Sequence, residues 1–244
     1  MAILKDSSDL LRILELCTVP HFTTLQKAAR TILSKKSIKK LISETVCILD
    51  VVVKDKDNKL SIAIDSTGLE SHHISRYFVK RRERGAKELY QTTTYKRFPK
   101  LAIGCDITTH MIAGALPLRG PTVDIVHFKK LVEETKSCVS FDTLLADAGY
   151  DSEESHRFAR EEHRVHAIIP PLIGRRTNKL PTGEYRREMA VNFDEQTYGQ
   201  RWQAETVFSM IKRNLGEALS AKTYQGQCRE IMLKVFTHNV MVLL

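Results

Sequence analysis

The segment from Tyr198 to Lys212 constrains the fold most, because it predicts a helix with two different faces. It contains no Gly or Pro after Gly199, and its residues tolerate a helix. At roughly 100° per residue, four polar side chains fall within about 60° of one another: Tyr198, Arg201, Glu205 and Lys212. An adjoining apolar stripe gives the helix a side to bury: Ala204, Phe208, Ile211 and Leu215. Acidic, phenolic and cationic groups should therefore line up beside the core.

The rest of the chain predicts strands and helices in a mixed order. Apolar runs and turn residues predict strands at 60–65, 101–106, 111–118, 143–147 and 165–169. Helical spacing is found at 5–47, 122–134, 152–162 and 230–244. An antiparallel meander followed by strand–helix alternation indicates a mixed α/β sheet rather than a purely parallel one. Between residues 172 and 196 the composition turns to Gly, Pro, Thr, Asn and Arg, which predicts an inserted loop.

Two aspartates occupy the same local context at the ends of predicted strands. Asp65 stands in Ile-Asp-Ser-Thr-Gly and Asp147 in Ala-Asp-Ala-Gly-Tyr. Strand ends are where α/β sheets present functional groups, so these carboxylates converge if the strands are neighbours. Glu205 could then complete an all-oxygen site, which favours magnesium or manganese over zinc. Taken singly, however, each aspartate is more often a turn or cap residue than a metal ligand.

The excess of basic residues suits a polyanionic partner, and nucleic acid fits this best. The net charge is +9, although a merely basic enzyme would show the same balance. Basic and aromatic residues alternate over 71–99, including Arg81, Arg82 and Arg84, and a lysine cluster lies at 34–40. Both segments suit contacts with nucleic acid or equally a solvated surface. The five scattered cysteines indicate reduced thiols in a cytosolic protein rather than disulfides or a zinc site, and no signal peptide or membrane span is visible.

Three motifs in order resemble the DDE transposases of bacterial and archaeal insertion sequences. Tyr198, Arg201, Glu205 and Lys212 match the Y-x-x-R-x-x-x-E-x-x-x-x-x-x-K signature at every spacing. Residues 147–150 match the second-aspartate motif of the family, and residues 64–68 match the first. The resemblance covers about residues 60–215 and implies a ribonuclease H-like fold with metal-dependent DNA cutting and joining.

The resemblance also implies a role for each matching residue. Asp65, Asp147 and Glu205 would be catalytic and bind magnesium or manganese, with two ions expected. Arg201 and Lys212 would contact phosphates at the transposon end, Tyr198 would help to position that end, and the basic 71–99 segment would add nonspecific contacts. Trp202 might be expected to stack on a displaced base, but core packing or a helix-flanking contact is the more common role.

The implied organisation is a helical segment over 1–55, a possible remnant of a DNA-binding region, followed by a catalytic domain over 60–244. The expected partners are the inverted-repeat ends of the element, target DNA and a second copy of the chain, in the cytoplasm at the nucleoid. A compact or truncated copy, a DNA-binding remnant without catalysis, and a nuclease without joining activity remain open alternatives.

Overall fold

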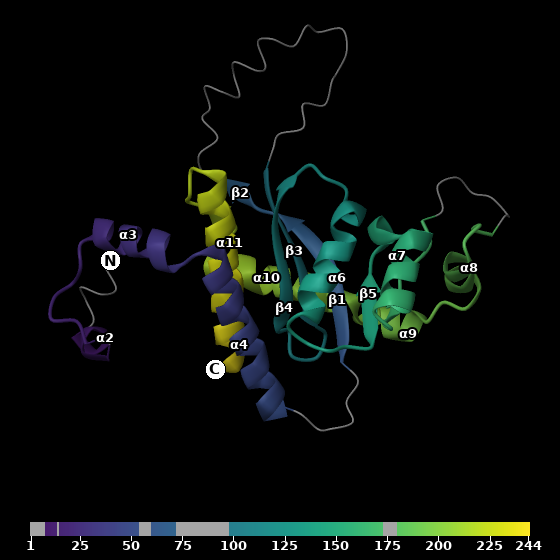
Figure 1. Ribbon diagram of the computed structural model, residues 1–244, viewed down its shortest axis with the longest axis horizontal. Coiled ribbons are helices and arrows are strands. Elements are labelled where there is room, and N and C mark those ends of the chain that lie inside the picture. Colours follow the sequence, from purple (N-terminus) through teal and green to yellow (C-terminus); the bar gives the residue numbers. More distant parts are fainter. Residues whose placement is uncertain (1–7, 14, 54–59, 72–97, 173–179) are drawn as a thin grey trace, which may run out of the picture.

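A mixed sheet of five strands forms the centre of the molecule (Figure 1). In chain order its strands are β1 (Ser61–Gly68), β3 (Phe98–Asp106), β4 (Ile112–Gly120), β5 (Thr143–Ala146) and β6 (His166–Ile168). Across the sheet the order is β4-β3-β1-β5-β6, and the short strands β2 (Glu70–Ser71) and β7 (Ala218–Leu219) pair separately. This computed structural model describes residues 8–13, 15–53, 60–71, 98–172 and 180–244.

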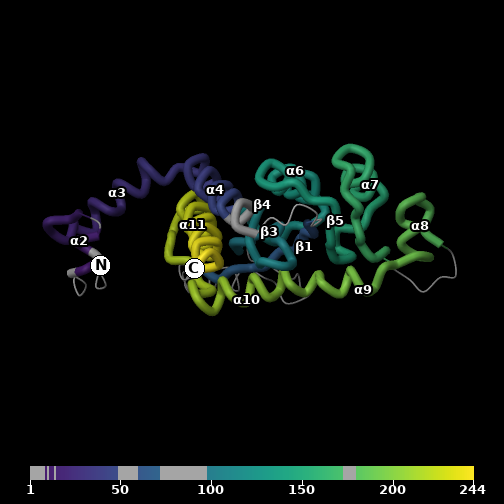
Figure 2. Tube along the Cα trace, turned by 90° about the horizontal axis from the view of Figure 1, so that it is seen from below, coloured from purple at the N-terminus to yellow at the C-terminus, as the bar shows by residue number. Residues whose placement is uncertain are grey.

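The helices of the described residues cover both faces of this sheet, except for the first two, which project away from it. In chain order the helices are α2 (Ser8–Ile13), α3 (Phe22–Ile32), α4 (Lys35–Val53), α6 (Phe128–Lys136), α7 (Glu153–Arg157), α8 (Glu184–Val191), α9 (Glu195–Tyr198), α10 (Gln203–Leu215) and α11 (Tyr224–Leu243). Four short helical turns connect them: η1 (Asp124–His127), η2 (Ala148–Tyr150), η3 (Phe158–Glu162) and η4 (Gly199–Trp202). Figure 2 shows α6 and α7 on one side of the sheet, α9 and α10 on the other, and α4 with α11 at the β4 end.

The side chains of β1 alternate between two apolar cores, one on each face of the sheet. Ile62 and Ile64 point into the core beneath α6, whereas Ala63 between them points into the core beneath α10 and α11. β1 pairs antiparallel with β3 and parallel with β5, and β3 pairs antiparallel with β4. The predicted hairpin and the predicted neighbours of the first strand are therefore confirmed. The α/β class is also confirmed, and the mixed sheet agrees with the expected ribonuclease H-like fold.

The predicted two-faced helix is a helical run built from α9, η4 and α10. Its α10 portion buries Ala204, Phe208 and Ile211 as predicted, together with Val207. Burying these apolar side chains against β1 and β3 contributes about 1.5–3 kcal/mol for each large one. Gly216 ends the helix with φ of 82°, a conformation that glycine adopts without a steric cost.

The predicted loop over 172–196 is partly wrong, because α8 and the first half of α9 lie in it. Only Met189 of α8 is buried, so its sequence lacks the apolar stripe that signals a helix. The helix is held by polar contacts instead. The backbone N–H groups of Tyr185 and Arg186 donate to the Glu153 carboxylate at 3.2 Å each, and the Arg186 guanidinium pairs with Asp151 at 2.7 Å.

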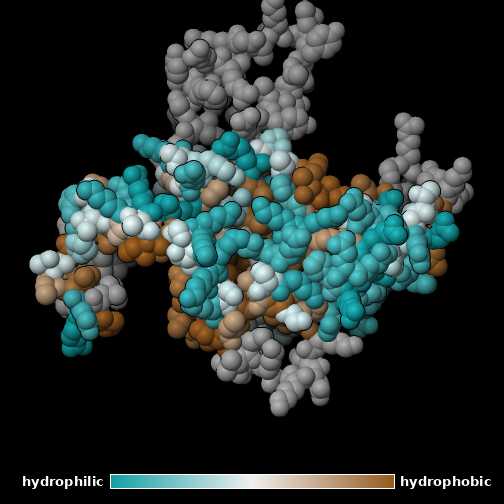
Figure 3. All heavy atoms as spheres, viewed as in Figure 1, coloured by the Kyte–Doolittle hydropathy of each residue, from teal (hydrophilic) through white to brown (hydrophobic). Residues whose placement is uncertain are grey.

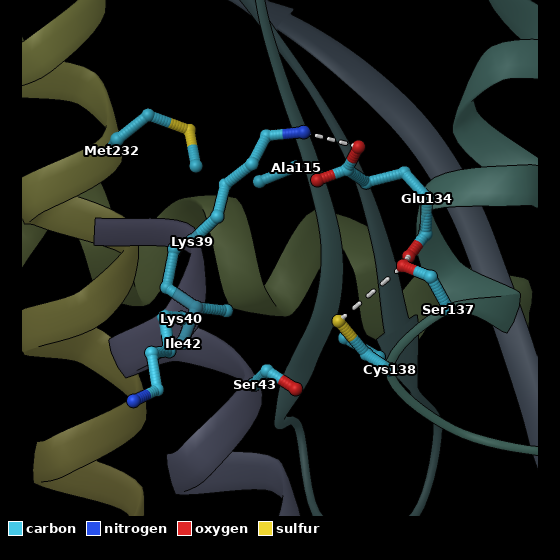
Figure 4. A pocket seen from close by; sticks show the side chains of 10 residues that line it. Lys39, Lys40, Ile42, Ser43, Ala115, Glu134, Ser137, Cys138 and Met232 are labelled. Atoms are coloured by element: carbon cyan, nitrogen blue, oxygen red, sulfur yellow. Dashed lines mark hydrogen bonds and ion pairs between the residues drawn. The ribbon is translucent and has the colours of Figure 1, made fainter. Parts of the chain in front are cut away.

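The predicted N-terminal helices are present as α2, α3 and α4. Figures 1 and 2 show α2 and α3 projecting from one end of the molecule, whereas α4 packs along α11 and β4. Hydrophilic side chains cover much of the face that α6 and α7 present in Figure 3. Lys39 of α4 forms an ion pair with Glu134 of α6 across a pocket of about 300 Å³ (Figure 4). Within the described ranges, no helix combines the length and apolarity needed to cross a bilayer.

Candidate active site

Asp65 and Asp147 lie side by side because of the parallel register of their strands. Ile64 of β1 pairs with Ala146 of β5, and each aspartate is the next residue along its chain. Both carboxylates therefore point to the face of the sheet that α10 covers. Asp147 accepts a hydrogen bond from the Gly149 N–H at 2.6 Å and so caps η2. A side chain at Gly149 would come within 2.8 Å of the Asp147 carboxylate, so the Asp-Ala-Gly sequence suits this turn.

Glu205 lies in the first turn of α10, four residues after Arg201, whose guanidinium bridges Glu205 and Asp65. The Arg201 guanidinium contacts Glu205 Oε1 at 2.7 Å and Asp65 Oδ2 at 3.5 Å. The Glu205 contact follows from the i, i+4 spacing on a helical run, whereas the Asp65 contact depends on how that run crosses β1. The structure thus brings together Asp65, Asp147, Arg201 and Glu205 from three separate parts of the sequence.

The surroundings of the Asp65 carboxyl disfavour its ionised form. Its pKa is raised to about 6, mainly by burial and also by the negative charges of Asp147 and Glu205. The Ser66 N–H, which donates to Asp65 Oδ1 at 2.7 Å, and the Arg201 guanidinium both act in the opposite direction and lower the pKa. The site therefore has a surplus of negative charge that a cation would stabilise.

The residues fit a divalent metal in ligand chemistry and in charge. All three side chains offer hard carboxylate oxygens, which magnesium and manganese prefer. In the part of the chain that the structure describes, no group of three or more His, Cys, Asp or Glu side chains is close enough to hold a metal. Arg201 pairs with both Asp65 and Glu205, so its positive charge partly balances theirs.

Tyr198, Lys212 and Trp202 lie on the same helical run with different partners. The Tyr198 ring packs against Phe193 at 4.9 Å between centroids, and burial raises the pKa of its phenol. Lys212 forms an ion pair with Glu217 at 2.9 Å rather than with the three carboxylates. Of the roles expected for Trp202, core packing is wrong, because 54% of this residue is exposed, whereas a helix-flanking contact and base stacking stay predictions.

The remaining predicted contacts, Arg81, Arg82 and Arg84, lie outside the described residues. Three further residues behind the site, Ser66, Lys100 and Asp124, are not among the predicted site residues. Ser66 donates a hydrogen bond to Asp124 at 2.6 Å, and Lys100 pairs with the same carboxylate at 2.7 Å. The one signal in the sequence was a lysine inside the apolar strand at 98–106.

Among the comparisons with known proteins, a family model shows the family of this chain. Residues 57–240 match the family model described as "Transposase DDE domain". No curated protein matches the chain. Among solved structures, the chain has a distant likeness to "Crystal structure of the Mos1 mariner paired end complex with Mn", at 11% sequence identity and a TM-score of 0.29. The likeness covers 99% of this chain and 76% of that one.

Proposed function

Because this chain belongs to the family of transposases with a DDE domain, we propose that it cuts and joins DNA strands with the help of divalent metal ions. We assign it to the insertion-sequence transposases that carry the Y-R-E-K signature. The observation that carries the proposal is the placement of Asp65 beside Asp147 at the ends of paired strands, with Arg201 in contact with both Asp65 and Glu205. Carboxylates crowded together in this way repel one another, so the site favours cations.

In this proposal Asp65, Asp147 and Glu205 would hold the metal, magnesium or manganese, with two ions expected. When bound, such ions supply activation of a water or 3′-hydroxyl and stabilisation of the leaving oxygen of a phosphodiester. The sheet fixes the two aspartates, and the buried face of α10 fixes Glu205. A rigid arrangement of this kind is what a metal-dependent reaction requires of its ligands.

The cations and aromatic groups beside the carboxylates suit DNA as the substrate. Arg201 presents a planar fork that matches a phosphate, and Lys212 adds a second positive charge further along the same helix. Tyr198 would position the end of the element. We further propose that the basic 71–99 segment and the helical segment up to residue 55 add contacts with DNA, and that two copies of the chain bring two ends together in the cytoplasm.

The test is strand cleavage by the variants Asp65→Ala, Asp147→Ala and Glu205→Ala, assayed with magnesium and with manganese. Each should lose cleavage by at least about 100-fold, because ligand loss removes several kcal/mol of transition-state stabilisation. DNA binding should remain. Glu195→Ala removes an exposed carboxylate from the same helical run and should retain full activity.

Each outcome separates the proposal from its alternatives. Full activity in any one of the three variants would remove that residue from the proposed triad. A wild-type protein that binds DNA but neither nicks nor joins it would indicate a DNA-binding remnant. Nicking without strand transfer, when a free 3′-end is supplied, would indicate a nuclease of the same fold.

A further inference from the structure

A polar group lies directly behind Asp65, on the opposite face of the sheet. Asp124 Oδ1 accepts a hydrogen bond from the Ser66 hydroxyl at 2.6 Å and pairs with the Lys100 ammonium at 2.7 Å. Lys100 also donates to the Thr122 carbonyl at 3.0 Å, which holds the segment before η1 in place. Only 11% of the Lys100 side chain is exposed, and lysine is rarely buried to this extent unless it is paired.

The geometry of β1 connects this group to Asp65. Asp65 and Ser66 are consecutive in a strand, so their side chains point to opposite faces. The Ser66 hydroxyl binds Asp124 on the α6 side, while the Ser66 backbone N–H donates to Asp65 Oδ1 at 2.7 Å. Ser66 is therefore fixed by its side chain on one face and holds the carboxylate on the other.

This arrangement determines which oxygen of Asp65 is available to the site. Oδ1 is engaged by the Ser66 N–H, whereas Oδ2 points to Arg201 beneath α10. A rotation of the carboxylate would break the hydrogen bond from Ser66. The contacts on the α6 side thus limit the orientation of a side chain on the α10 side.

Stability alone does not account for a charged pair at this position. Its neighbours on this face are the apolar side chains of Ile62, Ile64 and Ala102 and the buried Tyr150, whose phenol lies near Ser66 and Asp124. A partly buried ion pair among apolar residues is often no more stabilising than apolar residues of similar volume. Its best supported use is to fix one arrangement among several, and the arrangement fixed here is that of Ser66 and Asp65.

We propose that Lys100 and Asp124 are positioning residues that orient the Asp65 carboxylate for metal binding through Ser66. The inference rests on the proposed function in taking Asp65 as a metal ligand. Lys100 balances the charge of Asp124 and keeps that carboxylate turned toward Ser66. Contacts of this kind, one step removed from a metal ligand, typically change metal affinity by about 10–100-fold.

The experiment is a calorimetric titration of the full chain with manganese, below the melting temperature of every variant. Ser66→Ala removes the hydroxyl and should weaken manganese binding by about 10-fold, whereas Ser66→Thr keeps a hydroxyl and should restore most of the affinity. Lys100→Met should weaken binding similarly, because Asp124 loses its counter-charge. Lys129→Met is the matched control, since it breaks an ion pair with Glu154 on the same side of the sheet without touching Ser66.

The outcomes distinguish this inference from the proposed function. Equal manganese affinity in Ser66→Ala and the wild type would overturn the inference, as would an equal loss in Ser66→Thr or in Lys129→Met. If the wild type itself takes up no manganese, the proposed function fails and the inference fails with it. If Lys100→Met does not fold, the Ser66 pair alone decides, because those substitutions change only one small side chain.

Discussion

The Arg201 side chain partly neutralises two of the carboxylates in the candidate site. Its guanidinium contacts Glu205 at 2.7 Å and Asp65 at 3.5 Å, with 20% of the arginine side chain exposed. The negative charges of Asp65 and Glu205 repel each other, and this repulsion destabilises the fold unless a cation lies between them. The arginine supplies that charge without metal, and under the proposed function it would turn to DNA phosphates when metal takes its place.

A first prediction at this scale concerns Asp65→Asn. Because burial holds the folded-state pKa of Asp65 near 6, above its ordinary value of 3.8, the ionised carboxylate destabilises the fold at neutral pH. Without divalent metal, the substitution should therefore raise the free energy of unfolding at pH 7.5 by about 1–2 kcal/mol. The gain should shrink as the pH falls through about 6 and be nearly absent near pH 4, because the wild-type group is then neutral in the folded protein.

Denaturant unfolding at both pH values measures this effect. Glu195→Gln, at an exposed carboxylate of the same helical run, should show little change at either pH. An Asp65→Asn protein less stable than the wild type at pH 7.5 would contradict the prediction, and would mean that the ion pair with Arg201 outweighs the cost of burial.

The sequence was enough to find the three carboxylates but not their surroundings. Asp65 and Asp147 each follow an apolar strand, a local pattern, and Glu205 follows from helical spacing. The contact of Arg201 with Asp65 joins residues far apart in the chain, and so does that of Ser66 with Asp124. Such contacts depend on how α10 and η1 pack on the sheet, which no local pattern encodes.

At the scale of elements, α8 is a helix that depends on charge rather than on an apolar face. Its residue Arg186 forms two contacts of 2.7 and 2.9 Å with Asp151 Oδ2, whose side chain is fully buried. Arg160 of η3 adds an ion pair with Glu188 at 2.8 Å. A segment rich in Gly, Pro and Arg is predicted to be a loop. Composition does not show that its arginines form ion pairs with carboxylates elsewhere in the fold. This is the physical reason why the prediction over 172–196 failed where α10 succeeded.

A prediction for this element is that Arg186→Met lowers the free energy of unfolding by about 3 kcal/mol. The substitution leaves the Asp151 carboxylate buried without its cation, which typically costs 3–5 kcal/mol, and His156 at 3.7 Å offsets a part of it. Pairing it with Asp151→Asn should reduce the loss, since the uncompensated charge is then removed. Denaturant unfolding of the two single variants and the double variant gives the coupling.

The matched control lies next to it in the same helix. Arg187 is exposed and forms no ion pair within the described ranges, so Arg187→Met should change the stability by less than about 0.5 kcal/mol. A similar loss in both variants would mean that α8 responds to its helix propensity or net charge rather than to the contact with Asp151.

At the scale of the whole molecule, the sheet separates the candidate site from the residues that support it. Asp65 and Asp147 point to the face that α10 covers, where Arg201 contacts Asp65 and Glu205, while Ser66, Lys100 and Asp124 contact one another on the other face. Figure 2 shows α10 and α6 on opposite sides of the sheet. The α/β class was predictable because each strand and helix carries its own periodicity. The distribution of the net charge of +9 over the surface was not predictable from the sequence. It depends on which basic side chains form ion pairs with acidic ones in the folded protein.

The cations of the 71–99 segment give a final prediction at this scale, from the sequence alone. If Arg81, Arg82 and Arg84 contact phosphates, replacing all three by glutamine should flatten the dependence of log affinity on log salt by about 2–3, or roughly 0.9 per lost contact on duplex DNA. A control with the same change in charge replaces Lys129, Arg157 and Arg164 by glutamine. Lys129 and Arg157 already pair with Glu154 and Glu161 at 2.7 and 3.2 Å, so the control should leave the slope nearly unchanged. The slopes are measured by titrations of duplex DNA at several salt concentrations. Equal slopes in the two triple variants would mean that the segment is solvated surface that does not contact DNA phosphates.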